Sequence, residues 1–286
     1  MRTRQKWLIL RRISQAILVF LSAVWGKYTY AQPYKLAIVI DDVGYHQQED
    51  ANVFTMPKAI AVAIIPAAPY ARERNQQAYA QGRDILIHMP MQPMSNQAIE
   101  EGGLHLGMSQ QQVSQRVQQA QEIVSHAIGM NNHMGSAATV DETLMHYLMA
   151  ELQRQKLFFL DSRTIGHSVA SKVAKHYGVK SLERHIFLDD SNKLSDVQYQ
   201  FQQAINYARK HGVAVVIGHP RKNTLVVLQT GLSQLPSDIQ LVSIGSLWRD
   251  EKAVPIKPFI LLFNDIPAPT SVAPFERQEL LRGVPE

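Results

Sequence analysis

The chain contains no cysteine among its 286 residues. Disulfide bonds, thiolate metal sites and cysteine nucleophiles are therefore excluded. A chain without cysteine is compatible with an oxidising compartment, although the absence does not by itself indicate one. Any metal site in this protein must be built from other ligands.

Acidic residues are missing from the first 31 residues, which hold six lysines and arginines. Most of these basic residues precede an apolar stretch over residues 13–25, and Thr29-Tyr30-Ala31 places small residues at the usual cleavage offsets. This pattern predicts a secretory signal peptide over residues 1–31, because the apolar stretch is short for a transmembrane helix. The alternative is an uncleaved N-terminal anchor. In both cases the body of the protein faces the exported side, and we expect a periplasmic protein that keeps no stable membrane span after cleavage.

An excess of positive charge is absent from the remainder of the chain. The full sequence has 29 Lys and Arg against 24 Asp and Glu, but without residues 1–31 the balance is 23 against 24. The mature charge is therefore close to −1, and the sequence gives no electrostatic reason to expect nucleic acid binding.

The sequence also lacks internal repeats, low-complexity blocks and a convincing domain boundary. Its hydrophobic share of 45% supports a sizeable core. We therefore expect one domain over residues 32–250, followed by a proline-rich tail over residues 251–286. The tail carries one apolar patch, Phe259 to Phe263, and its role stays open.

Apolar runs alternate with helical patterns along this domain. Leu36 to Ile40 is apolar without alternation, as in a strand that is buried on both faces of a parallel sheet. Further strands are predicted over residues 59–65, 84–88, 129–135, 157–160, 186–188, 213–217 and 241–244. Helices are predicted over residues 49–56, 69–81, 108–128, 141–155, 169–177, 195–211 and 223–230, with Ser109 as an N-cap. This order predicts a parallel α/β fold, in which ligands bind at the carboxyl ends of the strands.

Polar residues follow the predicted strands at these ends. They are Asp41, Asp42, His88, Asn132, His133, Asp161, Asp189, Asp190 and His219. Adjacent carboxylates at the end of a buried strand repel each other, so they are most easily kept where a cation or a shared proton compensates them. Together these residues predict one polar rim above an apolar barrel or sheet.

Two imidazoles and a carboxylate form a common catalytic zinc set that leaves one position open. Asp42, His88 and His133 offer this set from three different strands. A divalent metal, in the first instance zinc, would activate a water molecule. Asp41 is then the candidate base, and His219 is the candidate acid that protonates a leaving nitrogen or oxygen.

Each of these residues also has a simpler interpretation. One of the two aspartates would cap the next helix while the other faces water, and Gly218 to Pro220 would be a plain turn. Asp161 and Asp189 would be N-caps, or Asp161 would hold a catalytic histidine by a hydrogen bond. The other eight histidines, which lie in predicted helices or loops, are interpreted as structural: His46, His105, His126, His146, His167, His176, His185 and His211.

Six segments together resemble the divergent polysaccharide deacetylase family, which belongs to the wider group of NodB-like carbohydrate deacetylases. The segments are LAIVIDDVGY (36–45), LIHMPM (86–91), GMNNHMGS (129–136), FLDS (159–162), FLDD (187–190) and IGHP (217–220). The resemblance covers about residues 33 to 250 and leaves out the predicted signal peptide and the tail.

This resemblance implies a distorted parallel (β/α) barrel of about seven strands with a divalent metal at its mouth. It also implies hydrolysis of an N- or O-acetyl group on an envelope polysaccharide. In the wider group the first aspartate of a pair is the base and the second binds the metal, which corresponds to Asp41 and Asp42. The late histidine motif, which supplies the acid, corresponds to His219.

The sequence departs from the wider group in two places. Typical members carry two metal-binding histidines four residues apart, whereas Gln92 stands four positions after His88. The second histidine must come from elsewhere, and His133 is the candidate. The Arg-Pro-Pro-Tyr-Gly motif that usually assists the base has no match in this chain.

Three functions stay open from the sequence. The first is a metal-dependent deacetylase of an envelope polysaccharide, and the second is a metal-dependent hydrolase of another ester or amide. The third is a barrel that binds an envelope glycan or protein without turnover and retains its metal site. Asp41 and His219 favour an enzyme, whereas the missing motif histidine and the apolar patch of the tail favour binding.

The basic and then apolar N-terminus leads to a first prediction. We expect the mature chain to begin near Gln32 and to lie outside the cytoplasmic membrane. N-terminal sequencing of the protein from separated cell fractions measures both properties. A cytoplasmic pool that retains Met1 as the main form would contradict the prediction.

Overall fold

The computed structural model describes residues 32–251. The predicted signal peptide, and all of the predicted tail except Glu251, lie outside this range. The strands are Tyr34–Val43 (β1), Ala61–Ile64 (β2), Ile85–Met91 (β3), Gly129–Met134 (β4), Phe158–Asp161 (β5), Ser181–Glu183 (β6), Ile186–Phe187 (β7), Val213–Gly218 (β8) and Ile239–Leu241 (β9). The α-helices are Gln47–Phe54 (α2), Ala71–Ala80 (α3), Gln110–Ile123 (α4), Glu142–Gln155 (α5), Ala170–His176 (α6), Leu194–His211 (α7), Lys222–Ser233 (α8) and Ile244–Trp248 (α9), with a 3-10 helix at Ala138–Val140.

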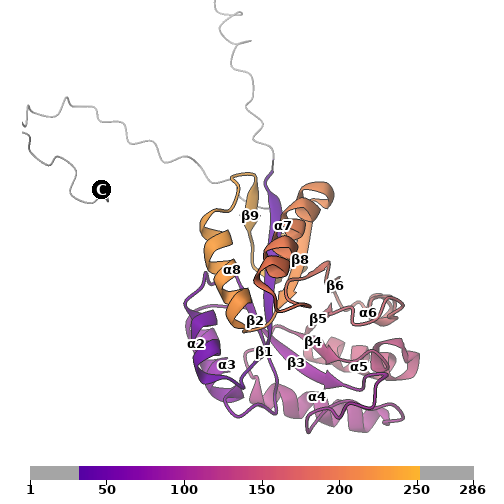
Figure 1. The fold of residues 1–286 in the computed structure, drawn as a ribbon. Coiled ribbons are helices and arrows are strands. Elements are labelled where there is room, and N and C mark those ends of the chain that lie inside the picture. Colours follow the sequence, from indigo (N-terminus) through magenta and orange to yellow (C-terminus); the bar gives the residue numbers. More distant parts are fainter. Residues whose placement is uncertain (1–31, 252–286) are drawn as a thin grey trace, which may run out of the picture. The chain divides into compact units, whose positions relative to one another are not determined.

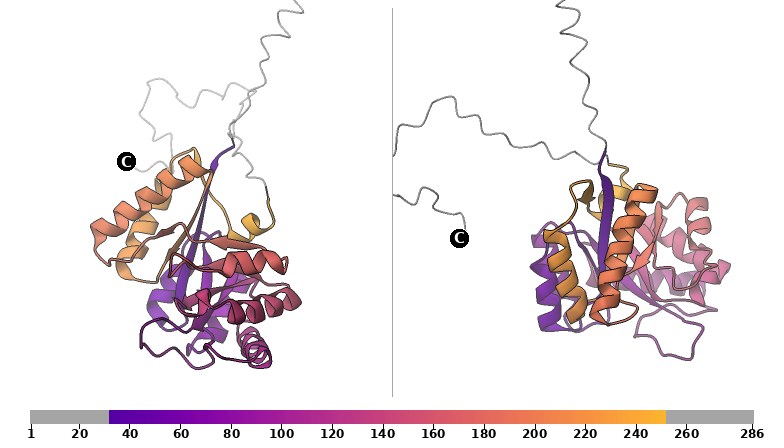
Figure 2. Two further views of the ribbon diagram at one scale, coloured as in Figure 1. Left: turned by 90° about the vertical axis from the view of Figure 1, so that its right-hand side faces the viewer. Right: turned by 45° about the horizontal axis from the view of Figure 1, so that its top comes forward.

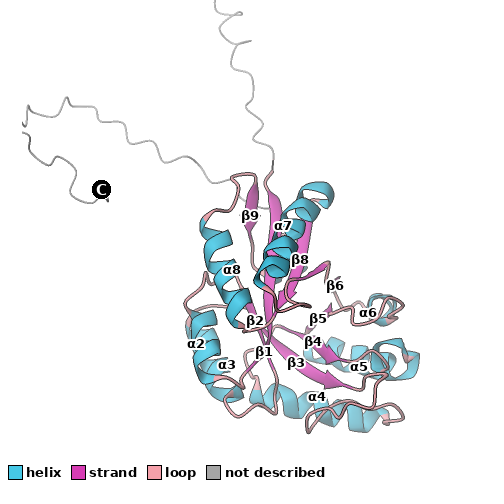
Figure 3. Ribbon diagram, in the orientation of Figure 1, coloured by secondary structure: helices cyan, strands magenta, loops and turns pink. Residues whose placement is uncertain are grey.

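The strands form one curled parallel sheet, and helices α2 to α8 lie outside it (Figures 1 and 3). The strand order is β6-β5-β4-β3-β2-β1-β8-β7, and β9 pairs with the first residues of β1. Around the outside α7 packs on α8 and α8 on α2, while α3, α4, α5 and α6 pack in series. Figure 2 shows the same arrangement from two further sides. The parallel α/β fold predicted from the alternating pattern is therefore confirmed.

A short segment lies between the two edges of the curled sheet. β6 and β7 occupy these edges, and only Arg184 and His185 separate them in the chain. The backbone N–H of Arg184 donates to Asp161 O of β5 at 2.9 Å, and that of His185 donates to Val215 O of β8 at 2.8 Å. Consecutive residues thus bond to β5 and β8, the strands next to the two edges, which brings the edges together and gives the sheet its distorted barrel form.

The core lies on both faces of the sheet. Leu36, Ile38 and Ile40 of β1 pack toward the helices, whereas Val39 packs in the interior with residues of the other strands. This is the period-2 alternation of a strand that is buried on both sides, which explains the unbroken apolar run. Trp248 of α9 packs in the interior and stacks on Phe158 at the amino end of β5, with ring centroids 5.0 Å apart. α9 therefore fills the end of the barrel opposite the carboxyl ends of the strands.

One predicted strand ends early in the structure, and one observed strand was not predicted. The predicted strand over residues 241–244 is wrong beyond Leu241, because Ser243 caps a helix by accepting a hydrogen bond from Ser246 N and Ile244 begins α9. β6 was not predicted, because a three-residue strand is too short to show a periodicity. By contrast, Ser109 is the N-cap of α4 as predicted, and it forms a capping box with Gln112.

Gly44 fixes the turn that leaves β1. Its φ of +118° lies in a region that residues with a side chain rarely adopt, and an added Cβ would lie 2.8 Å from Ala68 Cβ. Its N–H donates to the buried Asp50 Oδ2 at 3.0 Å. The turn that follows the two aspartates therefore requires glycine.

We predict that Gly44→Ala lowers the free energy of unfolding by about 1–3 kcal/mol, because the new methyl group adds both backbone strain and a clash. Gly166→Ala is the matched control, since a Cβ at this position meets no atom within 4 Å and should change stability by less than about 0.5 kcal/mol. Denaturant unfolding of the two variants measures the difference. Equal effects would contradict this account of the turn.

Candidate metal centre

An extra residue in β1 directs two adjacent carboxylates to the same place. Ile40 pairs with Val62 and Val43 with Ile64, so three steps along β1 match two along β2. Side chains of a regular strand alternate between faces, and a bulge of this kind changes their direction. Asp42 has a left-handed φ of 57°, which aspartate tolerates better than most residues. Both Asp41 and Asp42 consequently reach the carboxyl end of the barrel instead of opposite faces.

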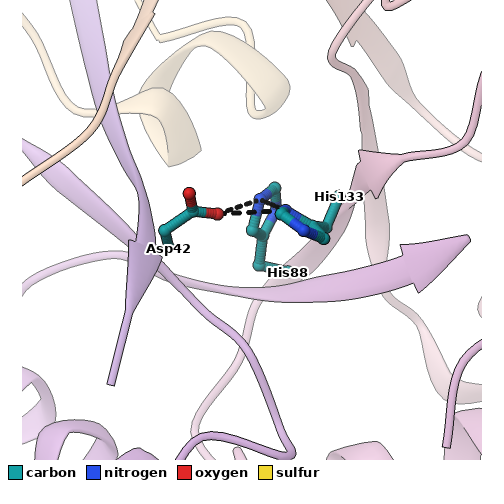
Figure 4. A group of neighbouring side chains, drawn as sticks. All are labelled: Asp42, His88 and His133. Carbon is teal, nitrogen blue, oxygen red and sulfur yellow. Dashed lines mark hydrogen bonds and ion pairs between the residues drawn. The ribbon is translucent and has the colours of Figure 1, made fainter. Parts of the chain in front are cut away.

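Three donor atoms meet at this end from three strands. Asp42 Oδ1 lies 3.2 Å from His88 Nε2 and 3.0 Å from His133 Nδ1, and the two nitrogens are 3.1 Å apart. Figure 4 shows the three side chains converging from β1, β3 and β4. The three residues are recognisable as a group that could hold a metal ion.

The arrangement of the donor atoms fits a divalent metal. Asp42 Oδ1 is buried, and His88 and His133 approach it as ion-pair partners without the geometry of a hydrogen bond. A buried carboxylate oxygen of this kind needs positive charge beside it, from a metal ion or from protonated imidazoles. Ligands of a tetrahedral zinc ion, with bonds of about 2.0–2.1 Å, lie about 3.3 Å apart, close to the observed separations. One carboxylate and two imidazoles are also the donor types of catalytic zinc sites.

Asn131 connects His88 to Asp41, although it was not among the site residues predicted from the sequence. The register of the parallel strands places His88 beside Asn131. Asn131 Oδ1 accepts a hydrogen bond from His88 Nδ1 at 2.9 Å. Its Nδ2 donates to Asp41 Oδ1 at 2.9 Å and to Asp41 Oδ2 at 3.1 Å. The sequence could have indicated Asn131, because a residue two positions before His133 lies on the same face of the strand.

His219 follows β8 and is held by Asp189. Its Nδ1 donates to Asp189 Oδ1 at 2.8 Å, and its backbone N–H donates to Asp189 Oδ2 at 2.8 Å. Thr224 Oγ1 donates to the same Oδ2 at 2.6 Å. His219 Nε2 is left facing the rim, 3.8 Å from Asp42 Oδ2. The N-cap of the next helix, α7, is Lys193, so the fully buried Asp189 is an anchor for the imidazole and not a helix cap.

Burial and charge shift the pKa values of the aspartates in opposite directions. Burial raises the pKa of Asp41 and outweighs the opposing effect of His88. Burial also favours the neutral form of Asp42, but the imidazoles of His133 and His88 hold its pKa well below the usual range. Asp42 therefore keeps its negative charge down to a lower pH than Asp41 does.

The carboxylates in turn raise the pKa values of the neighbouring histidines. Burial lowers the pKa of His88, but Asp41 and Asp42 outweigh it and raise the pKa to about 9. Burial likewise opposes the charged form of His219, yet the hydrogen bond to Asp189 raises its pKa above the ordinary value. The carboxylates that attract a proton to His88 also favour a divalent cation, and the two compete for the same nitrogen.

Gln92, four positions after His88, has a structural role in the loop after β3. Gln92 is not one of the metal-ligand group, and its Oε1 accepts a hydrogen bond from Leu106 N at 2.9 Å. Its backbone N–H donates to Leu104 O at 2.9 Å. Gln92 therefore joins the two ends of the loop. The same loop carries Glu100, whose Oε1 lies 3.5 Å from His133 Nε2.

The remaining predicted rim residues do not join the cluster. Asn132 accepts from Ser162 N at 2.9 Å and donates to Met134 O at 2.7 Å, so it holds neighbouring loops. Asp161 accepts from Arg163 N at 2.7 Å and does not hold a histidine, because Asp189 has that position. Asp190 is exposed. Neither Asp41 nor Asp42 caps α2, whose N-cap is His46.

Comparison with known proteins places this geometry in a family. An uncharacterized protein of Haemophilus influenzae (strain Rd) is 64% identical over 279 residues, covering 98% of this chain and 99% of that protein. The uncharacterized protein YibQ of Escherichia coli (strain K12) is 44% identical, covering 74% of this chain and 67% of that protein.

A solved structure has the same fold. It is an uncharacterized protein from Agrobacterium tumefaciens C58, with a TM-score of 0.71 and 17% sequence identity, covering 77% of this chain and 91% of that one. The model of the divergent polysaccharide deacetylases matches residues 38–248, which hold every residue of the metal centre and the Asp189–His219 pair. The chain therefore belongs to the divergent polysaccharide deacetylase family.

Proposed function

We propose that this protein is a metal-dependent hydrolase that removes acetyl groups from a polysaccharide of the cell envelope. The observation that carries the proposal is the shared rim on which three metal-ligand atoms lie beside a buried carboxylate and an anchored imidazole. Membership of the deacetylase family supports the acetylated polysaccharide as the substrate class. The predicted signal peptide supports a periplasmic location.

The metal ligands in this proposal are Asp42, His88 and His133, and the donor set favours zinc. A divalent ion at this position would acidify a water molecule and polarise the acetyl carbonyl. His88 is suited to this role because Asn131 occupies its Nδ1 and leaves Nε2 for the ion.

Within the described residues, no helix is both long and apolar enough to cross a membrane.

Proton transfer is assigned to the two residues beside the ligands. Asp41 takes the proton of the attacking water, and burial raises its pKa toward the range in which a carboxylate is an effective base. The water oxygen bonds to the acetyl carbon, and the bond from this carbon to the sugar nitrogen or oxygen breaks. His219 gives its proton to the departing atom, and Asp189 stabilises the charged imidazole before this transfer.

The metal centre gives a prediction that does not depend on the substrate. The purified protein should bind about one zinc ion, and His133→Ala should bind it much more weakly because one of three ligands is lost. His167→Ala is the control, since His167 is exposed and is not one of the metal-ligand group. Elemental analysis after dialysis measures the occupancy. Full occupancy in His133→Ala would remove His133 from the ligand set.

The proton-transfer roles give a prediction on turnover. Asp41→Asn and His219→Ala should each lower acetate release from isolated envelope glycans by a factor on the order of 10²–10⁴, the usual effect of a positioned acid or base. Both should still fold, and His219→Ala should retain zinc. Asp238→Asn is the control for a charge lost elsewhere, because Asp238 pairs only with Arg209 among the described residues.

The wild type decides between the three functions. Acetate release that a chelator abolishes supports the deacetylase. Release of another product from esters or amides, with no acetate from any glycan, would favour a different hydrolase. Glycan binding without any turnover in the zinc-loaded protein would favour the non-catalytic barrel and reject the proposed activity.

A further inference from the structure

The buried amide of Asn131 lies between a metal ligand and the candidate base. Asn131 is fully buried, and its neighbours His88 and Asp41 are each 2% exposed. We propose that Asn131 is a positioning residue that sets the orientation of His88 toward the metal and of Asp41 toward the attacking water. This inference rests on the metal centre of the proposed function, and it adds a residue that couples the two parts of the site.

The first half of this coupling acts on His88. A metal-binding imidazole presents one nitrogen to the ion, and its other nitrogen is a donor to a fixed acceptor. Asn131 Oδ1 is that acceptor, 2.9 Å from His88 Nδ1. Because Nδ1 carries the hydrogen, the lone pair of the neutral ring is on Nε2, the atom that faces Asp42 and His133.

The second half acts on Asp41. Asn131 Nδ2 donates to both carboxylate oxygens, at 2.9 and 3.1 Å, and lies 3.2 Å from Ser162 Oγ. These contacts fix the plane of a carboxylate that is buried beside the negative charge of Asp42. Asp41 Oδ2 lies 3.5 Å from His88 Nε2, so these contacts hold the candidate base beside the three metal-ligand atoms, where it can reach a water molecule on the ion.

The two contacts determine the direction of the amide together. If its oxygen and nitrogen exchanged places, the oxygen would face the carboxylate of Asp41 and the NH₂ group would face the N–H of His88, with no hydrogen bond on either side. An asparagine meets both demands because it has an acceptor and a donor on one planar group. An aspartate at this position keeps an acceptor for His88 but has no donor for Asp41, and a leucine has neither.

This difference allows the two halves to be tested separately in the purified full chain. Asn131→Leu removes both contacts, and Asn131→Asp keeps an acceptor for His88 but places a carboxylate against Asp41. Asn75→Leu is the matched control, because Asn75 is equally buried and makes three hydrogen bonds to Ser125 and His126, away from the metal ligands. Zinc affinity is measured by competition with a chelator, and acetate release is measured on envelope glycans.

The inference predicts different results for the three variants. Asn131→Leu should bind zinc about 10–100-fold more weakly, the usual effect of losing the partner of a metal-binding histidine. Asn131→Asp should bind zinc within about threefold of the wild type, while its kcat falls by about 10²-fold with little change in KM. Asn75→Leu should leave both quantities unchanged, whatever its effect on thermal stability.

Separate outcomes identify which part fails. Zinc affinity in Asn131→Leu equal to that of Asn75→Leu would overturn the inference while the proposed metal centre stands. Wild-type turnover in Asn131→Asp would overturn the half that concerns Asp41. If Asn131→Leu does not fold, the nearly isosteric Asn131→Asp still tests the inference, since a merely structural residue would not separate affinity from turnover. A wild type that binds no zinc would reject the proposed function and the inference together.

Discussion

The candidate site depends on the extra residue that β1 carries at its end. Without it, Asp41 would continue the interior face of Val39 while Asp42 would point into the apolar layer beneath the helices. A charged group in that layer would lose its hydration without compensation. The bulge instead brings both carboxylates to the mouth of the barrel, where they meet His88. The two carboxylates repel each other there, and a cation or protonated imidazoles must offset this repulsion.

The imidazoles that meet these carboxylates are held in different ways. His88 is bonded to the neutral amide of Asn131, whereas His219 is bonded to the buried carboxylate of Asp189. A neutral partner orients the ring without adding charge behind it. An ionised partner stabilises the imidazolium and increases the affinity of the ring for a proton. The two surroundings are consistent with the two proposed roles, one as a metal ligand and the other as an acid.

The loop after β3 is joined to the segment after β4 through Gln92. Gln92 closes this loop through its contacts with Leu104 and Leu106, and it also accepts hydrogen bonds at its carbonyl from Ala137 and Ala138. The loop is thereby joined to the segment that follows β4, the strand that carries His133. The second imidazole of the metal-ligand group, His133, comes from this strand.

The sequence by itself determined the parallel α/β architecture and the polar ends of the strands. A strand that is buried on both faces carries apolar side chains on both, so it can be predicted from an unbroken apolar run in the sequence. The motifs also indicated the family, including Asp41, Asp42, His88, His133 and His219. The periodicity failed where elements were short, as in β6, or where a single cap began a helix, as at Ser243.

The tertiary structure alone decided which side chains meet. Asn131 and Asn132 are adjacent and identical in type, yet only Asn131 contacts His88 and Asp41, because the register of β3 and β4 places it beside His88. In the same way, Asp189 rather than Asp161 holds His219, because β7 and not β5 lies next to β8. Register and strand order arise from hydrogen bonds between segments that are far apart in the chain. A local pattern of residues therefore shows where a strand ends, but not which neighbour its last side chains will contact.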